Sequence, residues 1–174
     1  MVVAFVAGLG ASYPLTFLLA VRVFDAGTKA FGIFEAVMGV GYLAGSVALA
    51  TLATRFPKGL AMAIGWAVMG ASLIAVAATE SVWQACIPLA VLGFFNAIAL
   101  IALDTWLQDV VPERLRGRVF GARFTLTQGT YAISVLVGGA LAGVFDVRAL
   151  FIVAGVLMAI PGIAALFVRG IRDA

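Results

Sequence analysis

Six apolar stretches, each about twenty residues long, fill this 174-residue chain, and the short segments between them carry nearly all of its charge. About 20 apolar helical residues cross a hydrocarbon core about 30 Å thick. A composition with 64% hydrophobic and 11% charged residues leaves little chain for a soluble domain. Backbone polar groups must be satisfied inside lipid, and these stretches are too long for barrel strands. The sequence therefore predicts an all-α membrane protein that the lipid bilayer surrounds.

The runs between charges predict a single domain of six transmembrane helices over residues 1–174. We place the spans at about 2–21, 31–53, 59–78, 83–104, 121–145 and 149–168. The chain starts inside its first apolar stretch, without the basic segment of a signal peptide. We therefore expect it to be a fragment of a longer protein.

The composition argues against most enzyme classes. The chain contains no histidine, which excludes His-ligated zinc or haem sites and a Ser-His-Asp triad. The single cysteine, Cys86, lies beside Pro88 in an apolar stretch, where a packing role is expected. No convincing nucleophile and base pair is evident, and no cofactor or metal is predicted. The net charge of +3 is interpreted by position along the spans, so no nucleic-acid partner is expected.

Basic residues are distributed unevenly between the two sides of the predicted bundle. One side holds Arg55, Lys58, Arg114, Arg116, Arg118, Arg169 and Arg172, with Arg123 at its border. The other side holds only Arg22, Lys29 and Arg148. Cytoplasmic loops carry an excess of Lys and Arg, so both termini are predicted to be cytoplasmic. Arginine outnumbers lysine nine to two, which favours a GC-rich bacterial source and hence the bacterial inner (plasma) membrane.

Two G-x-x-x-G pairs predict close approach of helix backbones. Gly41 and Gly45 lie in the second span, and Gly139 and Gly143 lie in the fifth. Small residues at this spacing let helices pack where lipid supplies no hydrophobic driving force.

A cluster of charges lies between the fourth and fifth spans. Asp104 and Asp109 are near the C-terminal end of the fourth span, where the helix dipole disfavours anions, so the arginines that follow are natural partners. One interpretation is a positive-inside anchor with solvated ion pairs. The other is a conformational latch that comprises Asp104, Asp109, Glu113, Arg114, Arg116, Gly117 and Arg118.

The same segment resembles a known family. The residues concerned are Gln108, Val111-Pro112-Glu113-Arg114-Leu115-Arg116-Gly117-Arg118-Val119-Phe120-Gly121, Thr127-Gln128-Gly129 and Gly138-Gly139. They resemble the C-terminal half (helices 7 to 12) of a major facilitator superfamily transporter, in the bacterial branch of siderophore and macrolide exporters. Leu52-Ala53-Thr54-Arg55-Phe56-Pro57-Lys58-Gly59 is similar to the family's loop between helices 8 and 9. The N-terminal version of that loop has an acid where Thr54 stands, which favours the C-terminal half.

The resemblance implies a 3+3 inverted repeat that forms one half of a major facilitator fold, with substrate carried between two six-helix halves. It further implies secondary active transport, as proton-coupled efflux of a small amphipathic molecule. The partner is then an N-terminal six-helix half or a second copy of this chain. The alternative is a non-transporting six-span subunit or scaffold that assembles with a partner.

Polar residues within the spans are the candidates for the substrate and proton pathway. Glu35 leads a strip with Tyr42 and Ser46, but it could instead lie among lipid headgroups and pair with Lys29 or Arg22. The fifth span has a longer polar stripe, whose hydroxyls could alternatively satisfy their own helix while Arg123 reaches the cytoplasmic border. The remaining candidates are Thr127, Gln128, Thr130, Tyr131 and Ser134 of that stripe, Asn96, and Tyr13 and Thr16 beside Pro14.

Overall fold

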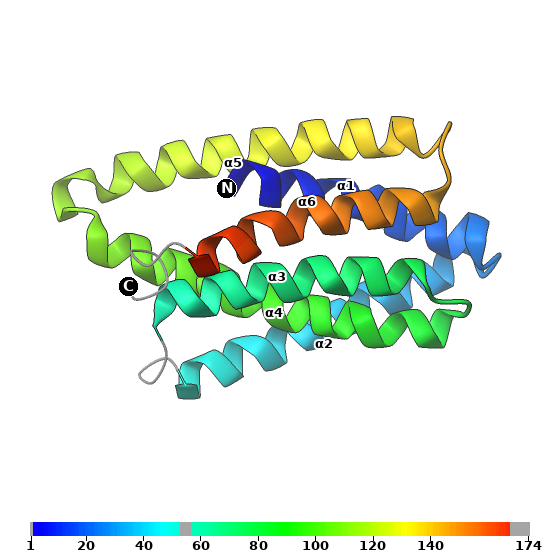
Figure 1. Cartoon of the computed structure of the whole chain (residues 1–174), viewed down its shortest axis with the longest axis horizontal. Helices are drawn as coiled ribbons and strands as arrows, with labels where there is room; N and C mark the ends of the chain where they lie inside the picture. The colour runs from blue at the N-terminus through cyan, green and yellow to red at the C-terminus, as the bar shows by residue number, and fades with distance from the viewer. Residues whose placement is uncertain (1, 53–56, 168–174) are drawn as a thin grey trace.

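The computed structural model describes residues 2–52 and 57–167 and shows an all-helical protein (Figure 1). Its helices are α1 (Val2–Leu18), α2 (Gly27–Leu52), α3 (Lys58–Ala77), α4 (Val82–Val110), α5 (Glu113–Leu141) and α6 (Val147–Phe167). Helix α1 continues into one π-helical turn, η1 (Leu19–Val23). Within the described ranges, α2 to α6 are long and apolar enough to cross a membrane, and Ala7–Val23 is a shorter apolar helix. The predicted helical class is confirmed.

The helices differ most from the predicted spans around the connection of α4 to α5. The charged segment 104–121 was expected to be a turn, yet only Val111 and Pro112 interrupt the helices there. Proline has no N–H to donate and pushes the preceding residue out of the helical region, and Val111 is extended. The charged residues predict where α4 leaves lipid, whereas Pro112 determines where α4 ends. Arg55, Arg169 and Arg172 of the orientation argument lie outside the described residues.

Three arginines hold the helix ends together. Arg22 donates a hydrogen bond to the Ala142 carbonyl just after α5 (3.2 Å), and Arg148 donates to the Ala77 carbonyl at the end of α3 (3.4 Å). Arg116 does the same for α4, through the Gln108 carbonyl (2.9 Å). Cations at helix C-termini satisfy free carbonyls and oppose the helix dipole.

The helices form one curved row, in the order α5, α1, α6, α3, α4, α2 (Figure 1). Helix α3, in the interior of the row, is 56% buried over its apolar window, whereas the edge helices α2 and α5 are only 17% and 11% buried. The largest fully buried side chains belong to the interior helices, to η1 and to the inner face of α2. They are Trp66, Phe34, Phe151, Leu15, Leu19, Met69, Leu73, Leu89, Leu92, Met158 and Val76.

The contacts between helices repeat within the row. Helix α1 packs against α5 and α6, and α4 packs correspondingly against α2 and α3, while α3 and α6 pack against each other. Exchanging the first three helices for the last three therefore leaves these principal contacts unchanged. Figure 1 also shows that α1 and α4 run in opposite directions.

Glycines set the closest helix approaches. A Cβ atom on Gly41 or Gly45 of α2 would collide with the backbone carbonyl of Ala90 or Phe94 of α4, so close packing at this pair is confirmed. The expectation for the other pair is wrong. Only the Pro14 Cβ, at 4.0 Å, would meet a side chain on Gly139, and Gly143 lies beyond the end of α5.

Candidate functional site

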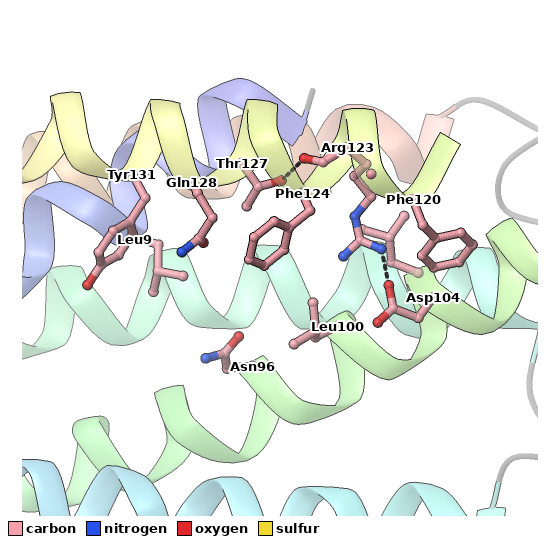
Figure 2. A pocket seen from close by; sticks show the side chains of 12 residues that line it. Leu9, Asn96, Leu100, Asp104, Phe120, Arg123, Phe124, Thr127, Gln128 and Tyr131 are labelled. Atoms are coloured by element: carbon pink, nitrogen blue, oxygen red, sulfur yellow. Dashed lines mark hydrogen bonds and ion pairs between the residues drawn. The ribbon is translucent and has the colours of Figure 1, made fainter. Parts of the chain in front are cut away.

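A cavity of about 800 Å³ lies between α4 and α5, and Leu9 from the middle of α1 completes its lining (Figure 2). Helices α4 and α5 are joined by a tight connection, but they are not among the pairs that pack closely along their lengths. The gap between them is lined by Leu9, Asn96, Leu100, Leu103, Asp104, Phe120, Gly121, Arg123, Phe124, Thr127, Gln128 and Tyr131.

Helix α5 supplies most of this lining through two rows of residues at four-residue steps. One row is Arg123, Thr127 and Tyr131. The other is Phe120, Phe124 and Gln128. Side chains four residues apart lie above one another on the same helix face, so both rows point into the cavity (Figure 2).

An ion pair between Arg123 of α5 and Asp104 of α4 spans the cavity at the end nearest the α4–α5 connection (Figure 2). The Arg123 guanidinium also lies over the Phe120 ring, with its Cζ 5.9 Å from the ring centroid. The side chains of Arg123 and Asp104 are 21% and 38% exposed. The two charges therefore neutralise each other at side chains that remain partly exposed.

This pairing corrects the partners expected from the sequence. Asp104 was assigned to Arg114, Arg116 and Arg118, but those residues are too close to the turn at Val111 and Pro112. In an antiparallel helix pair, residues at similar distances from the turn lie level with each other. That geometry brings Asp104 next to Arg123, which the sequence did not identify as its partner.

The other end of the cavity is polar without being charged. Gln128 and Tyr131 extend from α5, and Asn96 lies on the α4 side of the same space (Figure 2). Two amides and a phenol can donate and accept hydrogen bonds, while leucine and phenylalanine form the walls. The arrangement suits a molecule with a mostly apolar body and a few polar groups.

Several predicted pathway residues use their hydroxyls within their own helix. The acceptors are carbonyls three or four residues earlier, at 2.7–2.8 Å, for Thr16, Ser46, Thr127 and Ser134. The polar stripe of α5 divides accordingly. Thr127 still lines the cavity, whereas Thr130 is absent from the lining and Ser134 faces Gly10 of α1.

Glu35 lies on α2, half-buried, one turn beyond Phe31. Neither Lys29 nor Arg22 pairs with it in the described part of the chain, and Arg22 binds the Ala142 carbonyl instead. Glu35, Tyr42 and Ser46 all lie on α2, and none of them is among the residues that line the cavity.

The residues of the expected latch take different positions. Asp109 pairs with Lys58, the first residue of α3, not with an arginine of its own segment. Arg116 contacts a helix end as expected, donating to the Gln108 and Val111 carbonyls, and lies 3.7 Å from Glu113. The exposed Arg114 and Arg118 have no side-chain hydrogen bond or ion pair within residues 2–52 and 57–167, and Gly117 has open space around its Cβ position.

Sequence reasoning missed Lys58 as a partner and the apolar members of the cavity. Phe120 and Phe124 continue the four-residue row of Gln128 toward the start of α5, so the signal was present. The polar residues of the fifth span did not by themselves indicate that these two phenylalanines share their face.

Two comparisons with known proteins agree with this architecture. The family model described as Major Facilitator Superfamily matches residues 1–173. The chain is also 21% identical, over 136 residues, to the multidrug efflux pump Tap of Mycolicibacterium fortuitum. That alignment covers 78% of this chain and 33% of Tap, so the chain spans about a third of the length of this relative. Long apolar helices together with this match identify a multi-pass membrane protein of a transporter family, and the chain belongs to the Major Facilitator Superfamily.

Proposed function

We propose that this chain is one half of a secondary active transporter that exports a small amphipathic molecule. The cavity between α4 and α5 carries this proposal, as the chain's share of the substrate passage. Its volume of about 800 Å³ is within the range of small-molecule sites, and its walls are apolar with a few polar groups. The similarity to a multidrug efflux pump supports export as the direction.

The proposal includes a 3+3 inverted repeat. The exchange symmetry of the helix contacts supports it, because α1, α2 and α3 correspond to α4, α5 and α6. The opposite directions of α1 and α4 give the repeat its inverted sense (Figure 1). Transporters of this kind place their substrate at the interface of such repeats.

A second six-helix half completes the passage. The edge helices expose large apolar side chains, among them Val40, Leu43 and Val47 on α2. Part of this surface faces lipid and part is available to a partner, which is either an N-terminal half or a second copy of the chain. The resemblance of residues 52–59 to the family's loop between helices 8 and 9, with Thr54 where the N-terminal version has an acid, favours the C-terminal half.

The orientation follows from the basic residues. Lys58, Arg116 and Arg118 lie at the end of the bundle where α3 and α5 begin and α4 ends, and the Lys58–Asp109 pair joins α3 to α4 there. We assign this end to the cytoplasm of a bacterial cell, with both termini on the same side.

Proton coupling is assigned to Glu35, an acid without an ion-pair partner among the described residues. A Glu35→Gln variant of the full-length protein should lose export driven by a pH gradient. Unchanged gradient-driven export would remove this role.

Everted membrane vesicles from cells that make the full-length protein test the function. Acidifying the vesicle interior should drive uptake of an amphipathic fluorescent dye, and a protonophore should abolish it. Thr127→Trp fills the cavity and should reduce uptake at least about tenfold, because a bulky ring then occupies the substrate volume. Leu126→Trp, on the exposed side of the same helix, should leave uptake unchanged. Equal uptake by the two variants would contradict the assignment of the cavity, and no gradient-driven uptake by the wild type would favour the scaffold alternative.

A further inference from the structure

A second cluster of side chains lies on α1 and α2, outside the cavity. The Phe31 ring packs edge to face against Tyr13 (5.9 Å between centroids, 86°) and against Phe17 (5.5 Å, 81°). Tyr13 and Phe17 remain 45% and 38% exposed, so their rings are accessible. Glu35 follows Phe31 by one turn on the same face of α2. We call Tyr13, Phe17, Phe31 and Glu35 the aromatic–acid cluster.

The glycine contacts fix how the two halves of the chain correspond. A Cβ on Gly10 of α1 would meet the Tyr131 carbonyl of α5 at 2.9 Å, and one on Gly93 of α4 would collide with the Met38 carbonyl of α2. Gly10 therefore corresponds to Gly93, and Tyr131 corresponds to Met38. The second pair of contacts gives the same register independently, since Gly138 meets Ala11 and Gly45 meets Phe94.

This register superposes the aromatic–acid cluster on the cavity wall. The cavity residues Asn96, Leu100, Phe124 and Gln128 are the counterparts of Tyr13, Phe17, Phe31 and Glu35, respectively. Each member of the cluster thus corresponds to a residue that lines the cavity. The chemistry differs at three of the four positions, because a phenol, a second phenyl ring and a carboxylate replace an amide, a leucine and an amide.

Glu35 lies within the part of α2 that is long and apolar enough to cross a membrane. Helix α2 begins at Gly27, so Glu35 is about 12 Å along it, and its apolar stretch of 25 residues is longer than a hydrocarbon core of about 30 Å needs. A carboxylate at this depth requires a proton or a cation. In the part of the chain that the structure describes, no Lys or Arg forms an ion pair with Glu35.

We propose that the aromatic–acid cluster binds the positively charged end of an organic monocation. Resting on the proposed function, this makes the transported molecule a lipophilic cation. Aromatic ring faces and a carboxylate together attract a large, weakly hydrated cation. A divalent metal needs more oxygen ligands than this cluster has, and a proton needs no aromatic rings. The cavity between α4 and α5, which corresponds to the cluster by the register above, then binds the apolar body of the same class of molecule.

Binding of radiolabelled tetraphenylphosphonium to the purified full-length protein, in detergent at one fixed pH, tests the proposal. Glu35→Gln should weaken binding at least about tenfold, and Tyr13→Leu or Phe31→Leu by roughly 3- to 30-fold. Tyr13→Phe keeps the ring and should bind like the wild type. Phe145→Leu, at an exposed ring far along the chain from the cluster, is the matched control and should also bind normally. Tetraphenylborate, which has the same size and the opposite charge, should not compete.

Wild-type binding by Glu35→Gln, Tyr13→Leu and Phe31→Leu, or equal competition by tetraphenylborate, would overturn the assignment. If Glu35→Gln does not elute as a monodisperse protein, Phe17→Leu tests the same site through an accessible ring. The assay needs no gradient, so its result is separable from transport. If binding depends on the cluster but vesicles take up no dye, only the transport function is rejected. If vesicles take up dye but binding does not depend on the cluster, only this binding site is rejected.

Discussion

Lys58, the first residue of α3, forms an ion pair with Asp109 near the end of α4, and this contact joins the two helix ends. The side chains are 34% and 56% exposed, so the pair contributes about 0–1 kcal/mol to stability. Its importance is geometric. A rearrangement that separates the start of α3 from the end of α4 during transport must break the pair, whereas an anchor would leave it intact.

Reversing the charges tests whether this pair belongs to a latch. Lys58→Glu and Asp109→Lys should each change the rate of dye uptake, since like charges repel in the state in which the pair forms. The double variant should recover most of the wild-type rate. Unfolding in detergent should change by less than about 1 kcal/mol in all three. Wild-type uptake by both single variants would leave only the anchoring interpretation.

Arg116 and Arg118 should differ, although the sequence presents them as equals. Arg116 donates to two carbonyls at the end of α4, whereas Arg118 is exposed. Arg116→Ala should destabilise the protein by about 1 kcal/mol and slow uptake, because the free carbonyls lose their donor. Arg118→Ala should do neither. Parallel thermal unfolding and uptake measurements distinguish them, and equal loss in both variants would contradict the capping role.

The Arg123–Asp104 pair can be measured with a double-mutant cycle. Removing one partner leaves the other charge in the cavity without compensation. Arg123→Ala and Asp104→Ala should therefore each destabilise by about 1–2 kcal/mol, an estimate lowered for partial exposure. The double variant should cost less than the sum of the two. Additive unfolding free energies would show that the two side chains do not act together.

The sequence was sufficient for the features that depend on composition and period. Apolar runs interrupted by polar groups predict the bilayer and the number of apolar stretches. They also indicate three cavity candidates, Asn96, Gln128 and Tyr131. Pairings between helices could not be derived, because they depend on which residues the packing brings level. Asp104 has several arginines closer in sequence than Arg123, and Asp109 pairs with a lysine 51 residues away.

The glycines also show that sequence spacing does not determine which residues make the contacts between helices. Gly139 and Gly143 have the spacing of a packing pair, yet neighbouring Gly138 makes the contact, with a Cβ position 3.0 Å from the Ala11 Cα. Spacing alone identifies a stripe of small residues. The rotation of the helix decides which glycine of that stripe faces a neighbour, and that rotation is set by all contacts of α5 with α1.

Gly93 and Gly129 offer a matched test of this packing. A Cβ on Gly93 would collide with the Met38 carbonyl, so Gly93→Ala should force α2 and α4 apart and destabilise by about 1–3 kcal/mol. Gly129, within α5, has open space around its Cβ position, and Gly129→Ala should stabilise by roughly 0.5–1 kcal/mol through helix propensity. Reversible unfolding in mixed detergent micelles measures both changes. If the two substitutions had effects of the same sign and size, the close approach of α2 and α4 at Gly93 would be wrong, and with it the register that relates the aromatic–acid cluster to the cavity wall.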